Sequence, residues 1–233
     1  MSEDDIEILD LKNNPDDNQV EGIDEGKLLQ SIWLRPRDTL KYILNRCPDK
    51  YVTQLLVIGG AISALGNAIE GAPLFELGPW ISLVLIVTIG AIFGPIANMI
   101  FAVILNMVGR WIGGKGNYQK ILAVVAWSMV PSIVGVVFIF FQIGFFGPYF
   151  IFFEGDTSAL VMDFTKSELI LYVFAFLNSI VSIWALVILV TGLSVAHKFR
   201  IGKAILNLLI PILAIAIPLG IVAFILGDLM HGI

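Results

Sequence analysis

Five long apolar stretches, almost free of charge, are the feature that most limits what this chain can fold into. A bilayer span takes about 20 apolar residues, because each helical residue rises about 1.5 Å through a hydrocarbon core of about 30 Å. Of the 233 residues, 58% are hydrophobic and 14% are charged, which is too little charge to cover a soluble globule of this size. The sequence therefore predicts an all-α polytopic membrane protein with five transmembrane helices, at about residues 51–69, 80–109, 121–143, 169–196 and 204–226.

The basic residues predict the orientation of these spans. Thirteen of the 14 Lys and Arg residues precede the first span or lie in the loops that follow the second and the fourth spans. Lys166, between the third and fourth spans, is the exception. Basic residues collect on the cytosolic side of membrane proteins. We therefore expect a cytosolic N-terminus and an external C-terminus.

The chain divides into an acidic tail at residues 1–26, a basic amphipathic segment at 27–48 and a membrane domain at 49–233. Acidic residues dominate the tail, and its one basic residue is Lys12. A segment with so few apolar groups cannot offset its ordering entropy, so it is expected to be disordered. Either it is a solubilising leader, or it is a docking peptide for a cytosolic partner. Its ten acids are Glu3, Asp4, Asp5, Glu7, Asp10, Asp16, Asp17, Glu21, Asp24 and Glu25.

The segment 27–48 has its apolar residues on one helical face and carries five bases. Pro36 lacks a backbone donor and predicts a division into two short helices. Trp33, Arg35 and Arg37 are candidate contacts for lipid headgroups, where basic amphipathic helices with Trp are favoured. Packing of the same segment on the cytosolic ends of the spans is the equal alternative.

Small residues recur at every fourth position in the first two spans. Gly60, Ala64 and Ala68 form such a stripe in the first span. The second span carries Gly90, Gly94, Asn98, Ala102 and Asn106. Stripes of this kind allow helices to approach closely, so both should face the bundle interior. Exchanging the two glycines of the second span for Leu should weaken assembly, and Pro95 should kink this helix.

Two further patterns concern the later spans. The third apolar run continues to Phe153, about 50 Å of helix, which is too long for one span. We therefore end the span near Ile143 and expect an aromatic interfacial segment after it, formed by Phe145, Phe146, Tyr149, Phe150, Phe152 and Phe153. Amides within the spans either bond between helices or line a polar solute path; they are Asn98, Asn106, Asn178 and Asn207.

The sequence contains no pattern that supports catalysis. His197 and His231 fall on opposite sides of the predicted membrane, and Cys47 is the single cysteine. A metal or iron–sulfur site, a cofactor and an enzyme activity are therefore not expected, and a basic nucleic-acid binder is excluded by composition. The loop Gly113–Asn117 is glycine-rich around Lys115, so it could hold a phosphate headgroup; a tight cytosolic turn explains the same residues more simply.

Three stretches share one order along the chain: SIWLRPRDT at residues 31–39, GGKGNY at 113–118 followed by Trp127 and Pro131, and WALVILVTGLSVAHKFRIGKAIL at 184–206. Together, over roughly residues 27–227, they resemble bacterial members of the YIP family, named for Ypt/Rab-interacting proteins. The resemblance implies five spans, a cytosolic N-terminus and a short external C-terminus. Eukaryotic members associate with Rab GTPases in vesicle traffic, but their DLYGP motif is reduced here to Phe93-Gly94-Pro95, which argues against Rab-type GTPase binding.

Two function hypotheses follow. The first is a non-enzymatic integral membrane protein of the bacterial plasma membrane, acting through helix–helix, headgroup or protein-partner contacts in membrane organisation or trafficking-like roles. Its partners would be the lipid bilayer and a second copy of itself or another membrane protein. The alternative is a transporter or channel for a small or amphipathic solute, based on the amides and the proline-kinked spans. The spans carry no predicted internal acid or base, which argues against proton-coupled transport.

Overall fold

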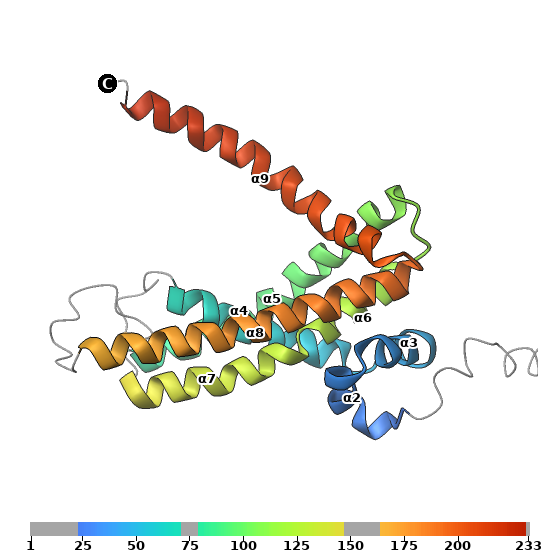
Figure 1. The fold of residues 1–233 in the computed structure, drawn as a ribbon, viewed down its shortest axis with the longest axis horizontal. Helices are drawn as coiled ribbons and strands as arrows, with labels where there is room; N and C mark the ends of the chain where they lie inside the picture. Colours follow the sequence, from blue (N-terminus) through green and yellow to red (C-terminus); the bar gives the residue numbers. More distant parts are fainter. Residues whose placement is uncertain (1–22, 71–78, 147–163, 232–233) are drawn as a thin grey trace, which may run out of the picture.

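The computed structural model describes residues 23–70, 79–146 and 164–231, and this part of the chain is helical without strands (Figure 1). This confirms the all-α expectation. A short 3-10 turn, η1, comes first, and eight α-helices follow it in the described ranges. Their bounds are η1 Glu25–Lys27, α2 Leu28–Leu34, α3 Pro36–Arg46, α4 Val52–Glu70, α5 Pro79–Trp111, α6 Tyr118–Ser128, α7 Val130–Phe146, α8 Phe164–His197 and α9 Ile201–His231.

Four helical stretches are long and apolar enough to cross a membrane: Trp80–Trp111, Tyr118–Phe141, Tyr172–His197 and Ile201–Ile221. They correspond to the second to fifth predicted spans. The first predicted span coincides with α4, whose apolar part, Val52–Gly66, is shorter. The ends of α8 and α9 extend beyond the predicted limits by up to five residues, since hydrophobicity marks the lipid-facing part of a helix but not its ends.

The third predicted span differs from expectation in being two helices. Pro131 has no backbone N–H to donate into the preceding turn, so α6 ends at Ser128 and α7 restarts at Val130. The backbone N–H of Met129 donates instead to the carbonyl of Ala126, 3.1 Å away. The helix α7 continues to Phe146, so its end lies three residues after the predicted one. The remainder of the expected aromatic segment, residues 149–153, lies outside the described residues.

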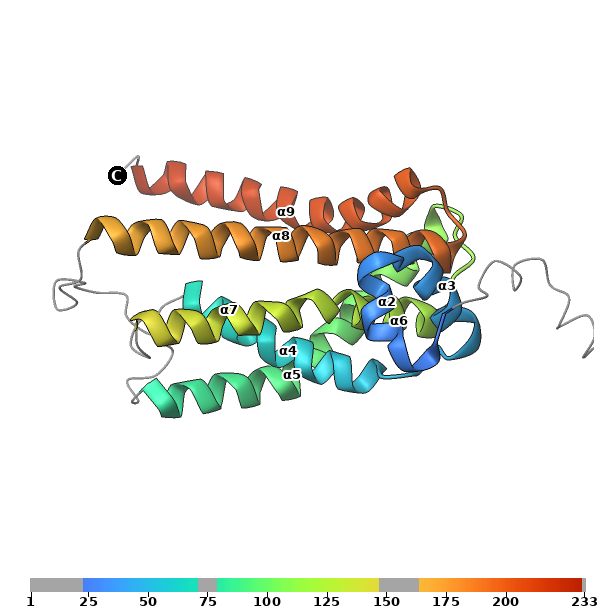
Figure 2. The same cartoon turned by 60° about the horizontal axis from the view of Figure 1, so that its bottom comes forward.

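Pro36 divides the amphipathic segment into α2 and α3, as expected. It is the first residue of α3, where its missing N–H is harmless. The helix α3 packs on α8 and α6, and α2 packs on α3, at the end of the bundle where the α5–α6 loop and the α8–α9 turn also lie (Figure 2). Two alternatives were open for this segment, headgroup contact and packing on the ends of the spans. For its apolar face, the structure shows packing. The described chain begins at Ile23, four residues before the predicted start of the segment.

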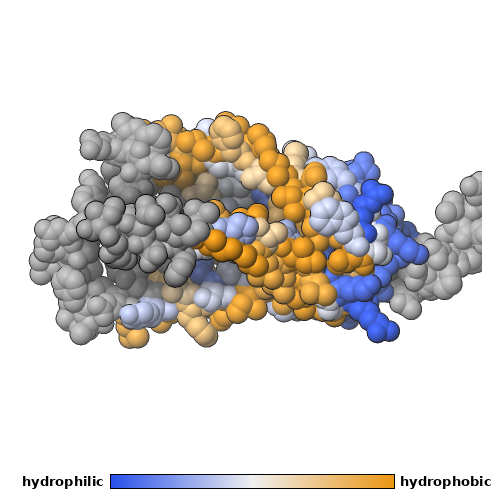
Figure 3. Space-filling view, turned by 90° about the horizontal axis from the view of Figure 1, so that it is seen from above, coloured by the Kyte–Doolittle hydropathy of each residue, from blue (hydrophilic) through white to orange (hydrophobic). Residues whose placement is uncertain are grey.

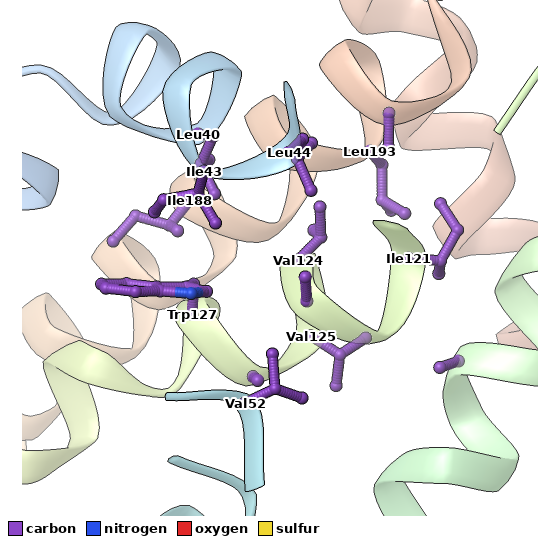
Figure 4. Packing of buried hydrophobic residues seen from close by; sticks show 14 of the residues in the cluster. Leu40, Ile43, Leu44, Val52, Ile121, Val124, Val125, Trp127, Ile188 and Leu193 are labelled. Atoms are coloured by element: carbon purple, nitrogen blue, oxygen red, sulfur yellow. The ribbon is translucent and has the colours of Figure 1, made fainter. Parts of the chain in front are cut away.

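Trp127 belongs to the buried core, and Leu40, Ile43 and Ile188 lie on one side of its ring (Figure 4). Its side chain is fully buried, and the ring of Tyr51 meets it edge-on at 6.2 Å between centroids. Around it, α3, α4, α6 and α8 each contribute apolar side chains with less than a tenth of their surface exposed. These are Leu40, Ile43, Leu44, Val52, Val124, Val125, Ile188 and Leu193.

Glycines bring α4 and α5 into backbone contact. A Cβ added to Gly60 would lie 2.6 Å from the Gly90 carbonyl oxygen and 2.7 Å from Gly94 Cα. An added Cβ on Gly90 would in turn overlap the Ala64 methyl group. Both glycines of the second span thus face a helix of the same chain, so the small-residue contact is intramolecular. The two helices can approach this closely only because neither has a side chain there.

The helices are closely packed near α2 and α3 and separate toward the opposite end. The far half of α9 extends away from the other helices (Figure 1). Every residue from Ile212 to Ile221 is exposed within the chain, and Leu219 is 63% exposed. These surfaces are apolar on all sides of the helix, which suits lipid contact.

Replacing Gly60 with Ala should destabilise the protein by about 1–3 kcal/mol, because the new methyl group meets the α5 backbone, which cannot rotate away. Gly66→Ala on the same helix is the matched control, since a Cβ there meets nothing within 4 Å. Denaturant-induced unfolding of the detergent-solubilised protein measures both. Equal stability of the two variants would contradict the close contact.

Candidate functional site

The polar residues of the bundle gather at one end, which we call the basic end (Figure 3). It consists of the segment from Ile23 to Tyr51, the α5–α6 loop, the α8–α9 turn and the helix ends that they join. Four acidic residues lie there: Asp24, Glu25, Asp38 and Asp49. Twelve bases lie there: Lys27, Arg35, Arg37, Lys41, Arg46, Lys50, Arg110, Lys115, Lys120, Lys198, Arg200 and Lys203.

His197, the last residue of α8, joins the two loops of the basic end. Its side chain is 1% exposed, and its Nδ1 accepts a hydrogen bond from the backbone N–H of Gly116 at 3.2 Å. Its carbonyl oxygen accepts from the backbone N–H of Lys115, also at 3.2 Å. An accepting Nδ1 means that the neutral ring carries its proton on Nε2. A second proton would occupy Nδ1 and remove the acceptor, so this loop contact requires a neutral imidazole.

Three glycines make room for the His197 ring. A Cβ on Gly109 would overlap the imidazole, and those on Gly114 and Gly116 would lie 2.5 and 2.7 Å from its Nδ1. Gly113 takes a φ of 90°, which side chains rarely adopt, so it provides the turn itself. The glycine-rich sequence is therefore explained by the packing of an imidazole and by the loop's turn.

Further contacts fix the α8–α9 turn. The ring of Phe199 stacks on His197 at 5.0 Å between centroids, and the Ser194 hydroxyl donates to the Phe199 carbonyl at 2.7 Å. The Lys203 ammonium donates to the Ile112 carbonyl at 3.3 Å and lies 5.8 Å from the Phe199 ring centre. The turn and the α5–α6 loop thus form one continuous surface.

Lys115 projects from this surface. It is exposed, as are Arg110 at the end of α5 and two cations of the α8–α9 turn, Lys198 and Arg200. The neighbouring Asn117 caps α6, because its Oδ1 accepts from the backbone N–H of Lys120 at 2.9 Å. The loop therefore presents cations on a rigid support.

Arg35 and Arg37, at the junction of α2 and α3, are also exposed. Between the buried Ile32 and these arginines, Leu34 is 86% exposed, although it is a large apolar residue. Trp33 is partly buried and packs against the core. The α2–α3 junction thus combines bases with an unburied apolar side chain, which is typical of an interfacial membrane contact.

One ion pair ties the start of the described chain to the basic end. The Lys50 ammonium donates to Glu25 Oε1 at 2.6 Å, and this hydrogen bond raises the pKa of Lys50. The thiol of Cys47 is partly buried; burial first, and the negative charge of Glu25 second, raise its pKa. A raised pKa keeps the thiol protonated and poorly nucleophilic near neutral pH, which agrees with an incidental cysteine.

The four amides of the spans lie in different surroundings. The Asn98 side chain donates to the Gly94 carbonyl of its own helix at 2.8 Å. Asn178 is partly buried, with its Oδ1 3.6 Å from a Cβ position on Gly135. Asn207 is fully buried on α9, and neither of its amide atoms has a protein partner; Asn106 Oδ1 on α5 is likewise unpaired. The helices α5 and α9 are in contact, so both unpaired amides belong to neighbouring helices.

The described residues contain no group of three His, Cys, Asp or Glu side chains placed to hold a metal ion. Sequence reasoning identified the exposed bases but missed the part of His197 in joining the loops. The sequence did contain a signal for this contact, since Gly109, Gly114 and Gly116 lie near the cytosolic ends of predicted spans. Without the fold, nothing pairs them with a histidine 81 residues after Gly116.

The architecture defines a class: a polytopic helical membrane protein with cations gathered at one end. Comparison with known families identifies it further. The model of the Yip1 domain matches residues 30–223, which is most of the chain. The chain therefore belongs to the Yip1 domain family, as the resemblance of its three sequence stretches indicated. Neither the curated proteins nor the solved structures gave a match.

Gly109→Ala should destabilise the protein by about 1–3 kcal/mol, because its methyl group would overlap the His197 ring. The same change should cost almost nothing when His197 is Ala, since the three heavy atoms nearest to that Cβ all belong to the imidazole. A double-mutant cycle of unfolding free energies measures this coupling. Gly202→Ala, which meets nothing within 4 Å, is the control. Additive costs for the two changes would contradict the contact.

Proposed function

We propose that this Yip1-family protein is a non-enzymatic membrane protein with five spans, whose basic end faces the cytosol and binds anionic headgroups. Through this end, and through contacts with a second copy or another membrane protein, it would serve membrane organisation or a trafficking-like role. Its place would be a bacterial plasma membrane. The observation that carries the proposal is the segregation of twelve bases, against four acids, at one end of an apolar bundle.

The length of α4 supports a fifth span. Its 19 residues rise about 28 Å, close to the thickness of the hydrocarbon core. It packs along α5 through Gly60 and Gly94, so it follows a helix that is long enough to cross. With α4 crossing, the number of spans is odd and the C-terminus lies outside.

Two tryptophans support the placement of α5. Trp80 and Trp111 are 62% and 72% exposed and stand near opposite ends of the helix. They are separated by about 46 Å of helix, which matches a bilayer of about 40–45 Å with its headgroup layers. Tryptophan is enriched at both interfaces of a membrane. The Trp111 end carries Arg110 and Lys115, which indicates the cytosolic side.

The headgroup site we propose is formed by Arg35, Arg37 and Lys115, with Trp33 and Leu34 at the same end. Each base near an anionic surface gains about 1 kcal/mol of attraction. The apolar Leu34 side chain can enter the acyl boundary, while the bases stay in the headgroup layer. The Yip1 family is generally non-enzymatic, which agrees with a binding role.

The topology is tested with single-cysteine variants in a Cys47→Ser background. Lys115→Cys should react with a membrane-impermeant maleimide only from the cytosolic side, and Ile233→Cys only from outside. Ser2→Cys, which precedes α4, should react from the same side as Lys115→Cys, whereas four spans without α4 would place these two labels on opposite sides. That result would remove the five-span topology.

Neutralising the headgroup site with Arg35→Gln, Arg37→Gln and Lys115→Gln should lower the amount of copurified phosphatidylglycerol at least tenfold, because three attractions of about 1 kcal/mol each are lost. Native mass spectrometry of the detergent-extracted protein measures the bound lipid. Lys166→Gln, a base predicted on the external side, is the control and should retain the lipid. Equal retention by the triple variant would refute headgroup binding.

A further inference from the structure

We propose that the acidic N-terminal segment, residues 1–22, docks on the basic end of its own chain and competes there with anionic headgroups. The docking is argued from charge and attachment alone. The competition rests on the headgroup binding proposed above. Such a contact would make the exposure of the basic end depend on salt and on lipid composition.

The charges of the segment and of the basic end are complementary. Residues 1–22 contain eight acids and one base, Lys12, which gives a net charge of −7. The basic end carries twelve bases and four acids, which gives a net charge of +8. The two are almost equal and opposite, and they belong to the same molecule. Charges of one sign on a compact surface repel one another. Docking of the acidic segment there would therefore lower the electrostatic free energy of the molecule.

Residues 1–22 are joined to the described chain at the basic end itself. The described chain begins at Ile23, which packs against the core of the basic end. The next residue, Asp24, accepts a hydrogen bond from the Gly26 N–H at 2.9 Å and begins η1. Glu25 then pairs with Lys50. The last two acids of the acidic run are thus already fixed on the basic end, and the preceding acids start from it.

The basic end also offers exposed cations with which the acidic segment can pair. Several exposed bases take part in no ion pair within the described residues: Arg35, Arg37, Arg110, Lys115, Lys198 and Arg200. They come from three places on the basic end, namely the α2–α3 junction, the α5–α6 loop and the α8–α9 turn. The packing of His197 holds the last two together. Twenty-two residues can extend up to roughly 75 Å, so the tether limits none of these contacts.

The physical form of the contact follows from its chemistry. Individual surface ion pairs are weak and are screened by salt within about 10 Å at 0.1 M. A tethered segment compensates through its high effective concentration. The carboxylates of the segment should therefore exchange among several cations of the basic end. The headgroups of an anionic bilayer carry the same sign of charge, so they repel the segment and compete for the same bases.

Carbodiimide crosslinking of the full chain in phosphatidylcholine nanodiscs tests the docking. Carboxylates of residues 1–22 should form zero-length links to Lys115 and Lys198 at 0.05 M salt, and these links should fall at least fivefold at 0.5 M. Light and isotopically heavy chains are mixed, each in its own nanodiscs, so that links within a chain are distinguished from links between chains. Replacing Lys115 and Lys198 by Arg keeps the charge but removes both reactive amines. It is the matched control, in which these two links disappear.

Absence of links to both lysines, or links confined to Lys27 and Lys50, would overturn the docking. Light–heavy links as frequent as light–light links would also overturn it, because the segment would then reach another copy. Exchanging about a third of the lipid for phosphatidylglycerol should reduce the links several-fold. If the crosslinks persist unchanged in the nanodiscs that contain phosphatidylglycerol, the competition with headgroups is refuted, but the docking is not. Headgroup binding itself is judged separately by the lipid retention of the triple variant.

Discussion

The core that α2 and α3 share with Trp127 is the interaction on which the rest of the structure depends. These helices precede the spans, so burying Leu40, Ile43 and Leu44 removes apolar surface from water, a gain of about 25 cal/mol per Å². Contacts between spans inside lipid gain no such energy, because lipid is as apolar as the side chains. The core is accordingly concentrated near the basic end, where water supplies the driving force.

Away from that core, the helices are held together by close steric fit at glycines. Gly60 and Gly94 let α4 and α5 touch through their backbones, and His197 fits among three glycines. Both contacts depend on missing side chains, so each is specific without carrying charge. The cations are then free to face outward on a surface whose position is fixed. This arrangement separates the residues that hold the protein together from those that we propose to bind headgroups.

Much of this could be predicted because it follows local rules. The positions of the second to fifth apolar stretches, the division at Pro36 and the close approach at the small-residue stripes come from properties of neighbouring residues in one helix. The break at Pro131 was expected only as a kink, since sequence does not show whether a helix bends or restarts. Asn98 bonds the Gly94 carbonyl one turn before it, because that partner is always within reach. The joining of two loops by His197 depends on tertiary structure and could not be predicted.

The exposed far half of α9 has a mechanical consequence. Its residues from Ile212 to Ile221 are all exposed within the described chain, so packing does little to fix their direction. The tilt of a membrane helix is normally set by packing and by interfacial anchors. Where packing is missing, hydrophobic thickness sets the tilt instead, with Pro211 and Pro218 as the places of least bending resistance. The outer part of α9 should thus lean further in a thin bilayer and stand more upright in a thick one.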